Sequence, residues 1–176
     1  WHVVHELVAF DMGLERFGHH LMADLQTKFP KSEVFIWGDP AGSKRDEIFE
    51  VTAFDHLRTL GLRAQPTASN DFKVRREAGA MPMNRLIDGR PGLLVSRECA
   101  RTRKALSGGY HFKRVAVGAG HERFRDAPNK NEHSHVGDAY GYLMLGGGEH
   151  RTLTRNPNGR PQFRQLVAKA DFDVFG

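Results

Sequence analysis

The chain has 176 residues, of which 39% are hydrophobic and 10% aromatic, so it can bury one sizeable core but is too short to suggest two ordinary domains. No apolar run approaches the length that spans a bilayer, and the single cysteine, Cys99, excludes an internal disulfide framework and a cysteine-rich zinc site and fits a reducing, cytosolic setting. Lys and Arg number 26 against 21 Asp and Glu, and this net charge of +5 favours an extended polyanion as partner, although an ordinary basic protein has the same balance.

The first part of the chain predicts a strand, a helix and a second strand that ends in an aspartate. Residues 2–10 are rich in valine and alternate loosely, which indicates a strand. A helix that ends before Pro30 is predicted next, because apolar residues recur at helical spacing at Leu14, Phe17, Leu21 and Leu25. Residues 34–37 form a continuous apolar run typical of a strand buried on both faces, and the chain then turns at residues 38–42.

Strands and helices continue to alternate through the middle of the chain. We expect a helix over 49–60 and a strand over 62–64. Asn70 or Asp71 can cap a basic helix that runs toward Asp88 and is kinked or divided at Pro82. A strand over 92–95 and a helix over 98–106 follow.

The last part of the fold is predicted to hold a hairpin and a final helix. Residues 110–117 and 121–125 flank a glycine-containing turn and indicate the hairpin. Ser134 can cap the final helix, which ends at the glycines 146–148. The alternation of strands and helices predicts an α/β layer sandwich over residues 1–146, and the polar segment 147–176 is predicted to be a flexible tail.

Two aspartates are the candidate catalytic residues. Asp39 is predicted at the carboxyl end of a buried strand, where open α/β sheets bind ligands, although a turn-forming Asp-Pro is the ordinary interpretation. Asp138 falls near the start of the final helix, where an aspartate also favours the helix dipole, and His135 precedes it by three residues on the same helical face. Carboxylates that face each other repel unless a cation neutralises them, and Mg²⁺ or Mn²⁺ suits such oxygen ligands. A zinc site of His133, His135 and Asp138 is the competing interpretation.

Basic residues are distributed around these positions in a way that would neutralise phosphates on both sides of a cleft. The candidate DNA-binding residues are Lys44, Arg45, Arg75, Arg76 and Lys130. Further cations follow at Arg123 and Arg125, whereas the basic run 101–104 is interpreted as a solvated face. No glycine-rich stretch matches the phosphate loop of ATPases, so we expect no ATPase site.

Four segments, taken together, resemble the nuclease domain of the large terminase subunit of tailed phages. These segments are 38–42, 70–71 with 84–94, 106–110 and 128–139, and they match in order and spacing across roughly residues 1–145. The resemblance implies a ribonuclease-H-like mixed sheet with helices on both faces, and an endonuclease that trims concatemeric double-stranded DNA by two-metal hydrolysis in the cytoplasm of a bacterial host. It also implies an ATPase motor domain, a portal protein and a small terminase subunit as partners. By similarity, Asp39 is the second catalytic carboxylate, Asp138 is the last, and His135 corresponds to an extra ligand position of related junction resolvases.

One feature of the family is not visible in the sequence. Its first catalytic aspartate lies on a strand upstream of the segment that resembles residues 2–10, and the sequence opens at Trp1 as if it were a piece of a longer polypeptide. We therefore expect a fold that lacks the first strand and an incomplete site that cuts slowly or not at all. A non-catalytic DNA-binding module and a resolvase or transposase relative remain the alternatives.

Overall fold

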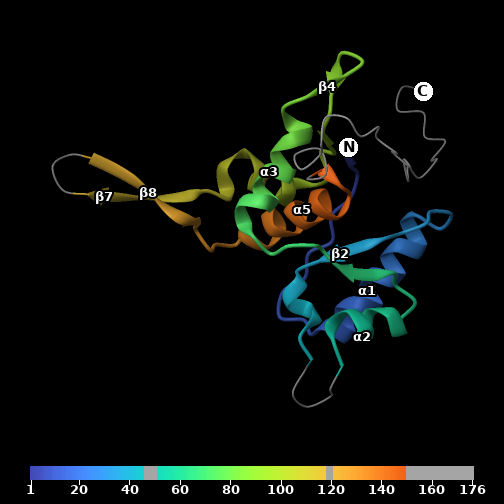
Figure 1. Cartoon of the computed structure of the whole chain (residues 1–176). Helices are drawn as coiled ribbons and strands as arrows, with labels where there is room; N and C mark the ends of the chain where they lie inside the picture. The colour runs from blue at the N-terminus through green and yellow to red at the C-terminus, as the bar shows by residue number, and fades with distance from the viewer. Residues whose placement is uncertain (46–50, 118–120, 150–176) are drawn as a thin grey trace, which may run out of the picture.

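The computed structural model describes residues 1–45, 51–117 and 121–149, which form a mixed α/β structure (Figure 1). The helices are α1 (Leu14–Lys28), α2 (Ala53–Thr59), α3 (Phe72–Met83), α4 (Ala100–Lys104) and α5 (Ser134–Gly146), with a short 3-10 turn η1 (Pro40–Ser43) and a π-type turn η2 (Ala105–Gly109). The strands are β1 (His2–Val3), β2 (Ile36–Gly38), β3 (Ala64–Pro66), β4 (Leu86–Ile87), β5 (Arg90–Pro91), β6 (Leu94–Val95), β7 (Phe112–Val117) and β8 (His121–Pro128).

Among the described residues the strands pair two by two and do not join into one continuous sheet. Strand β1 runs parallel to β6, with His2 opposite Leu94, and β2 runs parallel to β3, with Ile36 opposite Ala64. The pairs β4 with β5 and β7 with β8 are antiparallel hairpins. The single mixed sheet that the sequence predicts is therefore replaced here by four short ladders.

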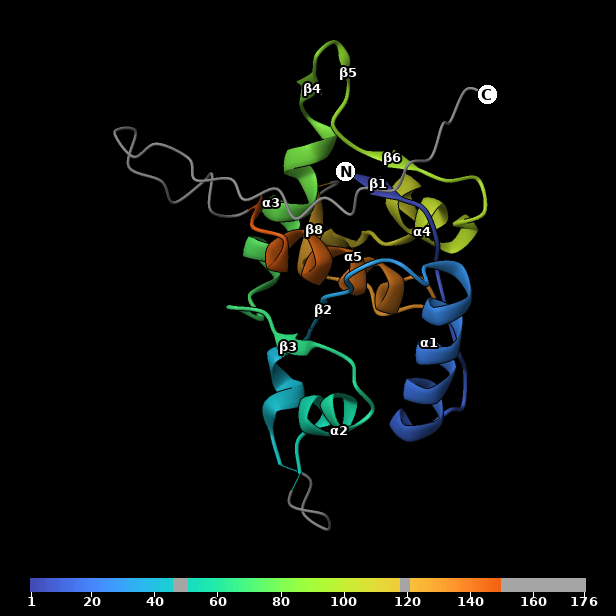
Figure 2. The same cartoon turned by 90° about the vertical axis from the view of Figure 1, so that its right-hand side faces the viewer.

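The carboxyl end of α5 explains why the two parallel pairs do not meet. In Figure 2, α5 lies between the strand β1 and the pair formed by β2 and β3. A Cβ atom added at Gly146 would come within 2.1 Å of Trp37, and one added at Gly147 would come within 2.2 Å of Trp1. The two glycines thus let the helix end pack between a tryptophan of β2 and the tryptophan that precedes β1.

The core lies between α3 and α5. Ala78 and Met144 are fully buried, and Leu145 is 2% exposed. Burying a side chain of the size of Met or Leu contributes about 1.5–3 kcal/mol, so these contacts dominate the packing of the two helices. Tyr140 is buried in the same cluster, and its hydroxyl donates to the Gly79 carbonyl at 2.8 Å, which satisfies its one polar atom.

Several predicted elements are present with shifted bounds. The first helix forms over Leu14–Lys28, and the predicted hairpin forms from β7 and β8. Of the two candidate caps for α3, the structure selects Asp71, whose carboxylate accepts from the backbone amides of Lys73 (2.7 Å) and Val74 (3.2 Å). The fold class is therefore mixed α/β, as the alternation of elements predicts.

Three local predictions were wrong. The strand over 2–10 ends at Val3, because the partner strand β6 is only two residues long. The helix toward Asp88 ends at Met83, and the chain then forms the β4–β5 hairpin with Asp88 and Gly89 in its turn, both at positive φ (51° and 77°). Ser134 does not accept a capping bond at the start of α5, because its hydroxyl donates to the Asn131 carbonyl at 2.7 Å.

The predicted flexible tail, 147–176, lies almost wholly outside the described residues, which end at residue 149. In the described part of the chain, no helix is both long enough and apolar enough to cross a membrane.

Candidate active site

Asp39 directly follows β2 and is half-buried at the start of η1. Its Oδ1 accepts a hydrogen bond from the backbone amide of Ala41 at 2.8 Å, and Pro40 occupies the first position of the turn, where no amide hydrogen is needed. The predicted position at a strand end is correct. The same contact also gives Asp39 the turn-forming role that was its ordinary interpretation.

Asp138 lies on the first turns of α5, and its side chain is only 15% exposed. Its Oδ1 accepts from Arg75 Nη1 at 2.6 Å and from the Tyr110 hydroxyl at 2.8 Å, and its Oδ2 accepts from Lys130 Nζ at 3.0 Å. Burial by itself raises the pKa of this carboxyl, but the bonds from Arg75, Lys130 and Tyr110 outweigh burial and hold the pKa below its ordinary value. Asp138 is therefore an anion at neutral pH.

Tyr142 connects the two aspartates. It lies four residues after Asp138 on α5, which packs against β2, and its hydroxyl donates to Asn70 Oδ1 at 2.5 Å. Burial raises the pKa of Tyr142, and the nearby carboxylates of Asp39 and Asp138 raise it further, against an opposing effect of the Arg75 charge. Both carboxylates thus act on one buried hydroxyl, although they are far apart in the sequence.

We call Asp39, Asn70, Arg75, Asp138 and Tyr142 the aspartate cluster. Arg75 contacts two of its members, with its guanidinium carbon 4.5 Å from the centroid of the Tyr142 ring and its Nη1 2.6 Å from Oδ1 of Asp138. The cluster therefore contains two carboxylates and one buried cation.

Gly137 explains how Tyr110 reaches the aspartate cluster. A Cβ atom at this position would lie 2.4 Å from Cδ1 of Tyr110, closer than real side-chain contacts allow. The absence of a side chain lets the Tyr110 ring pack on the first turn of α5, and its hydroxyl then reaches the adjacent Asp138. Burial and the Asp138 carboxylate raise the pKa of Tyr110, so it stays protonated and donates.

The aspartate cluster supplies hard oxygen ligands of the kind that Mg²⁺ and Mn²⁺ prefer. The Oδ2 atom of Asp138 bonds to a lysine, Lys130, that is 72% exposed, whereas its Oδ1 atom bonds to the buried Arg75 and to Tyr110. Among the described residues, however, no group of three or more His, Cys, Asp or Glu side chains can hold a metal ion. His135 is exposed and does not complete a set with Asp39 and Asp138, and the zinc interpretation with His133 finds no support.

The candidate DNA-binding residues fall into two groups. Lys44 and Arg45 are exposed just after η1, Lys130 is exposed beside Asp138, and Arg76 is exposed in an ion pair of 2.6 Å with Glu77. The prediction that Arg75 binds DNA is wrong, because Arg75 is buried and paired with Asp138 and so does not face a phosphate.

The sequence did not single out Tyr110, Tyr142 or Asn70 as functional residues. The spacing of four residues between Asp138 and Tyr142 is a signal for a shared helix face. For Tyr110 no local signal exists, because its contact with α5 joins residues on either side of the β7–β8 hairpin.

No protein-family profile, no curated protein and no solved structure matches this chain. The function is therefore argued from the aspartate cluster and from the sequence.

Proposed function

We propose that the chain is the nuclease domain of a viral DNA-packaging terminase and hydrolyses double-stranded concatemeric DNA with Mg²⁺ or Mn²⁺. The proposal includes a ribonuclease-H-like architecture, action in the bacterial host cytoplasm, and an ATPase motor domain, portal protein and small subunit as partners. The observation that carries it is the packing of α5, which bears Asp138, against β2, which ends next to Asp39, so that both carboxylates raise the pKa of Tyr142. Metal ions held between such carboxylates activate a water molecule and stabilise the leaving oxygen of a phosphodiester.

The residues around the two aspartates have distinct roles in this proposal. Tyr142 lies next to Asp39 on the side of the protein interior, and its hydroxyl is held by the bond to Asn70. Arg75 and Tyr110 fix Oδ1 of Asp138, so that Oδ2 is the oxygen that points to its exposed partner. Lys130 is the cation that exchanges Asp138 for a DNA phosphate, because its side chain is 72% exposed and an ion pair to so exposed a lysine contributes only about 1 kcal/mol.

A plasmid-nicking assay with added Mg²⁺ or Mn²⁺ tests the proposal. Because the family's first catalytic aspartate is not visible in the sequence, we expect slow metal-dependent nicking. It should be lost in Asp39→Ala and in Asp138→Ala and retained in Glu15→Ala, a matched removal of an exposed acid on α1. Thermal unfolding of each variant separates lost chemistry from lost folding, and Asp138→Asn, which keeps the shape of the side chain, provides a second variant at the buried position. Nicking that survives both aspartate substitutions would discard the assignment.

A second candidate function is a DNA-binding module of the same fold that does not cut. The observation that favours it is the neutralisation of Asp138 by two of the protein's own cations, Arg75 and Lys130, which leaves no net negative charge to attract a metal ion at that carboxylate. Titration calorimetry with Mn²⁺ separates the two functions. Binding that is lost in Asp39→Ala and Asp138→Ala supports the nuclease, whereas salt-sensitive DNA binding without Mn²⁺ binding supports the module.

A further inference from the structure

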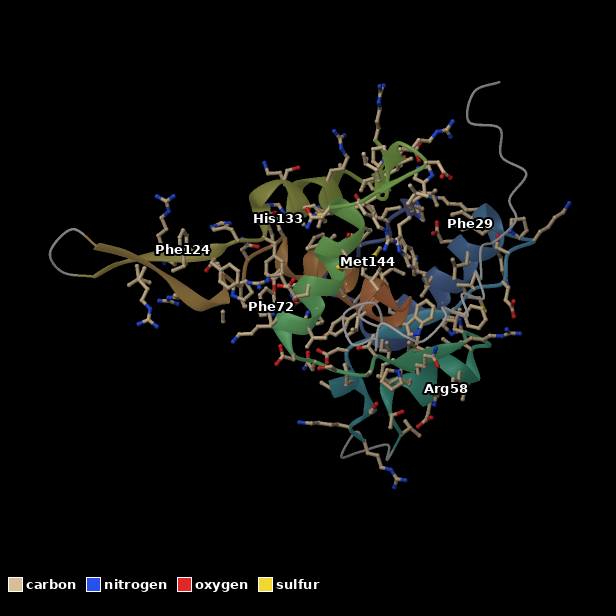
Figure 3. The ribbon with its side chains drawn as sticks, turned by 45° about the horizontal axis from the view of Figure 1, so that its top comes forward. Phe29, Arg58, Phe72, Phe124, His133 and Met144 are labelled. Atoms are coloured by element: carbon tan, nitrogen blue, oxygen red, sulfur yellow. The ribbon has the colours of Figure 1, made fainter. Side chains whose placement is uncertain are left out.

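The β7–β8 hairpin is an arm that stands away from the rest of the described structure. Figure 1 shows its two strands extending to one side of α3 and α5, and Figure 3 shows Phe124 far out on this arm and Met144 in the body of the protein. Phe124 is 53% exposed and Val115 is 38% exposed, so the strands do not pack on the core. An exposed two-stranded ribbon is only marginally stable in isolation, which indicates that it has a partner.

The root of the arm is fixed beside the aspartate cluster. Phe112, the first residue of β7, packs edge-on against Phe72 of α3 with ring centroids 5.6 Å apart. Next to Phe112 in the sequence, the carbonyl of His111 accepts a hydrogen bond from the amide of Asn129 at 2.8 Å, which joins the two strands at the base of the arm. The residues next in line, Tyr110 on one side and Lys130 on the other, both donate to Asp138. A partner held by the arm therefore lies next to the aspartate cluster.

The arm carries positive charge on both of its faces. Its sequence over residues 112–128 contains four Lys and Arg and two Asp and Glu, a net charge of +2. The four cations are Lys113, Arg114, Arg123 and Arg125, and all of them are exposed. Arg114 stands opposite Phe124 and Val115 stands opposite Arg123, so the two arginines Arg114 and Arg123 project from opposite faces of the ribbon. The guanidinium of Arg114 also lies over the Phe124 ring, 5.5 Å from its centroid.

We propose that the β7–β8 arm inserts into a groove of duplex DNA and holds the duplex against the aspartate cluster. The major groove is about 12 Å wide and admits a two-stranded ribbon. It also has a phosphate chain on each side, which matches arginines on opposite faces of the ribbon, whereas a flat acidic surface would meet only one face. The gripping role stands on the arm alone, and only the delivery of DNA to Asp39 and Asp138 depends on the proposed function.

Fluorescence anisotropy with a labelled duplex of about 30 base pairs, in buffer containing EDTA, measures this grip without cleavage. The test variant is Arg114→Ala/Arg123→Ala/Arg125→Ala. The matched control is Arg16→Ala/Lys31→Ala/Arg90→Ala, which removes the same charge from exposed positions outside the arm. Each lost phosphate contact reduces the magnitude of the slope of log affinity against log salt concentration by about 0.9. We therefore expect this slope to fall by about 2.7 in the arm variant, which lacks three arginines, and by far less in the control. Equal slopes in the two variants overturn the proposal.

Two further outcomes are decisive. Single-stranded DNA or an RNA duplex that binds as tightly as the DNA duplex, with the same dependence on the three arginines, overturns insertion into a DNA groove. Absence of any duplex binding by the parent chain overturns it as well. The proposed nuclease function is tested separately from the role of the arm. DNA binding that depends on the arm, without metal-dependent nicking, supports the role of the arm and rejects the nuclease function. Nicking that is lost in Asp39→Ala and Asp138→Ala but unchanged in the arm variant supports the nuclease function and rejects the role of the arm.

Discussion

Replacement of Arg75 by methionine removes the buried cation of the aspartate cluster. The Arg75 side chain is 9% exposed and its partner Asp138 is 15% exposed, with 2.6 Å between Nη1 and Oδ1. Its guanidinium also lies over the rings of Phe72 and Tyr142, at 5.7 and 4.5 Å. Methionine fills much of the same volume, so the substitution chiefly removes the charge and its hydrogen bond.

The expected cost follows from burial. Removal of one partner of a buried ion pair costs about 3–5 kcal/mol, because the other charge stays desolvated and unpaired. Asp138 keeps Lys130 and Tyr110, so we expect the lower end, about 3 kcal/mol. Lys130→Met removes a cation that is 72% exposed, and its cost should stay below about 1 kcal/mol. In Arg75→Met/Asp138→Asn both charges are gone, and its cost should be smaller than the sum of the two single costs by about 2 kcal/mol.

Urea unfolding at pH 7 measures the free energy of unfolding of the parent, the three single variants and the double variant. The reasoning is refuted if Arg75→Met costs no more than Lys130→Met, because the two pairs would then be equally exposed. Additive costs in the double variant would refute it too, since they would mean that Arg75 and Asp138 do not interact.

Two other predictions concern contacts away from the buried pair. Gly137→Ala places a Cβ atom 2.4 Å from the Tyr110 ring and should cost about 3 kcal/mol of unfolding free energy, the upper end for overpacking. Tyr110→Phe keeps the ring and loses only the bond to Asp138, which should cost about 1.5 kcal/mol. A cost of Gly137→Ala in urea unfolding no larger than that of Tyr110→Phe would contradict this packing. Glu6 accepts from the amides of Arg101 and Thr102 at the start of α4, and although burial raises its pKa, these bonds hold the pKa below its ordinary value of 4.5. The contribution of the Glu6 carboxylate to stability is thus complete above pH 4.5 and is lost as the pH falls through the lowered pKa. Glu6→Gln should therefore cost about 1–2 kcal/mol of unfolding free energy at pH 7 and progressively less below pH 4.5. A cost that does not change with pH would refute the capping role of Glu6.

The parts of the structure that the sequence predicts well depend on local interactions. The helix α1 follows from its apolar spacing, and the cap of α3 follows from an aspartate placed two and three residues before the amides that it accepts from. Asp39 could be placed at a strand end because a buried apolar run followed by Gly-Asp-Pro is itself a local pattern. The position of Asp138 near the start of α5 follows in the same way.

The parts that the sequence does not predict depend on contacts between remote segments. Nothing near Glu6 in the sequence indicates that its carboxylate caps a helix that starts at Ala100. The burial of Arg75 depends on α5 packing along α3, and a helical arginine on its own is indistinguishable from a surface cation. The β4–β5 turn is the exception, because Asp88-Gly89 is a local hairpin signal that a continuing helical pattern concealed.

The arm and the aspartate cluster are joined by hydrogen bonds at Asp138. Each of the two chains that leave the hairpin places a donor on Asp138, Tyr110 on Oδ1 and Lys130 on Oδ2. The two donors differ in strength of attachment, because Tyr110 is half-buried against Gly137 whereas Lys130 is mostly exposed. Under the proposed arm function, a phosphate at the root of the arm would compete for Lys130 and leave Tyr110 in place. Under the proposed function, the arrival of DNA uncovers one oxygen of Asp138 while Arg75 and Tyr110 keep the other fixed.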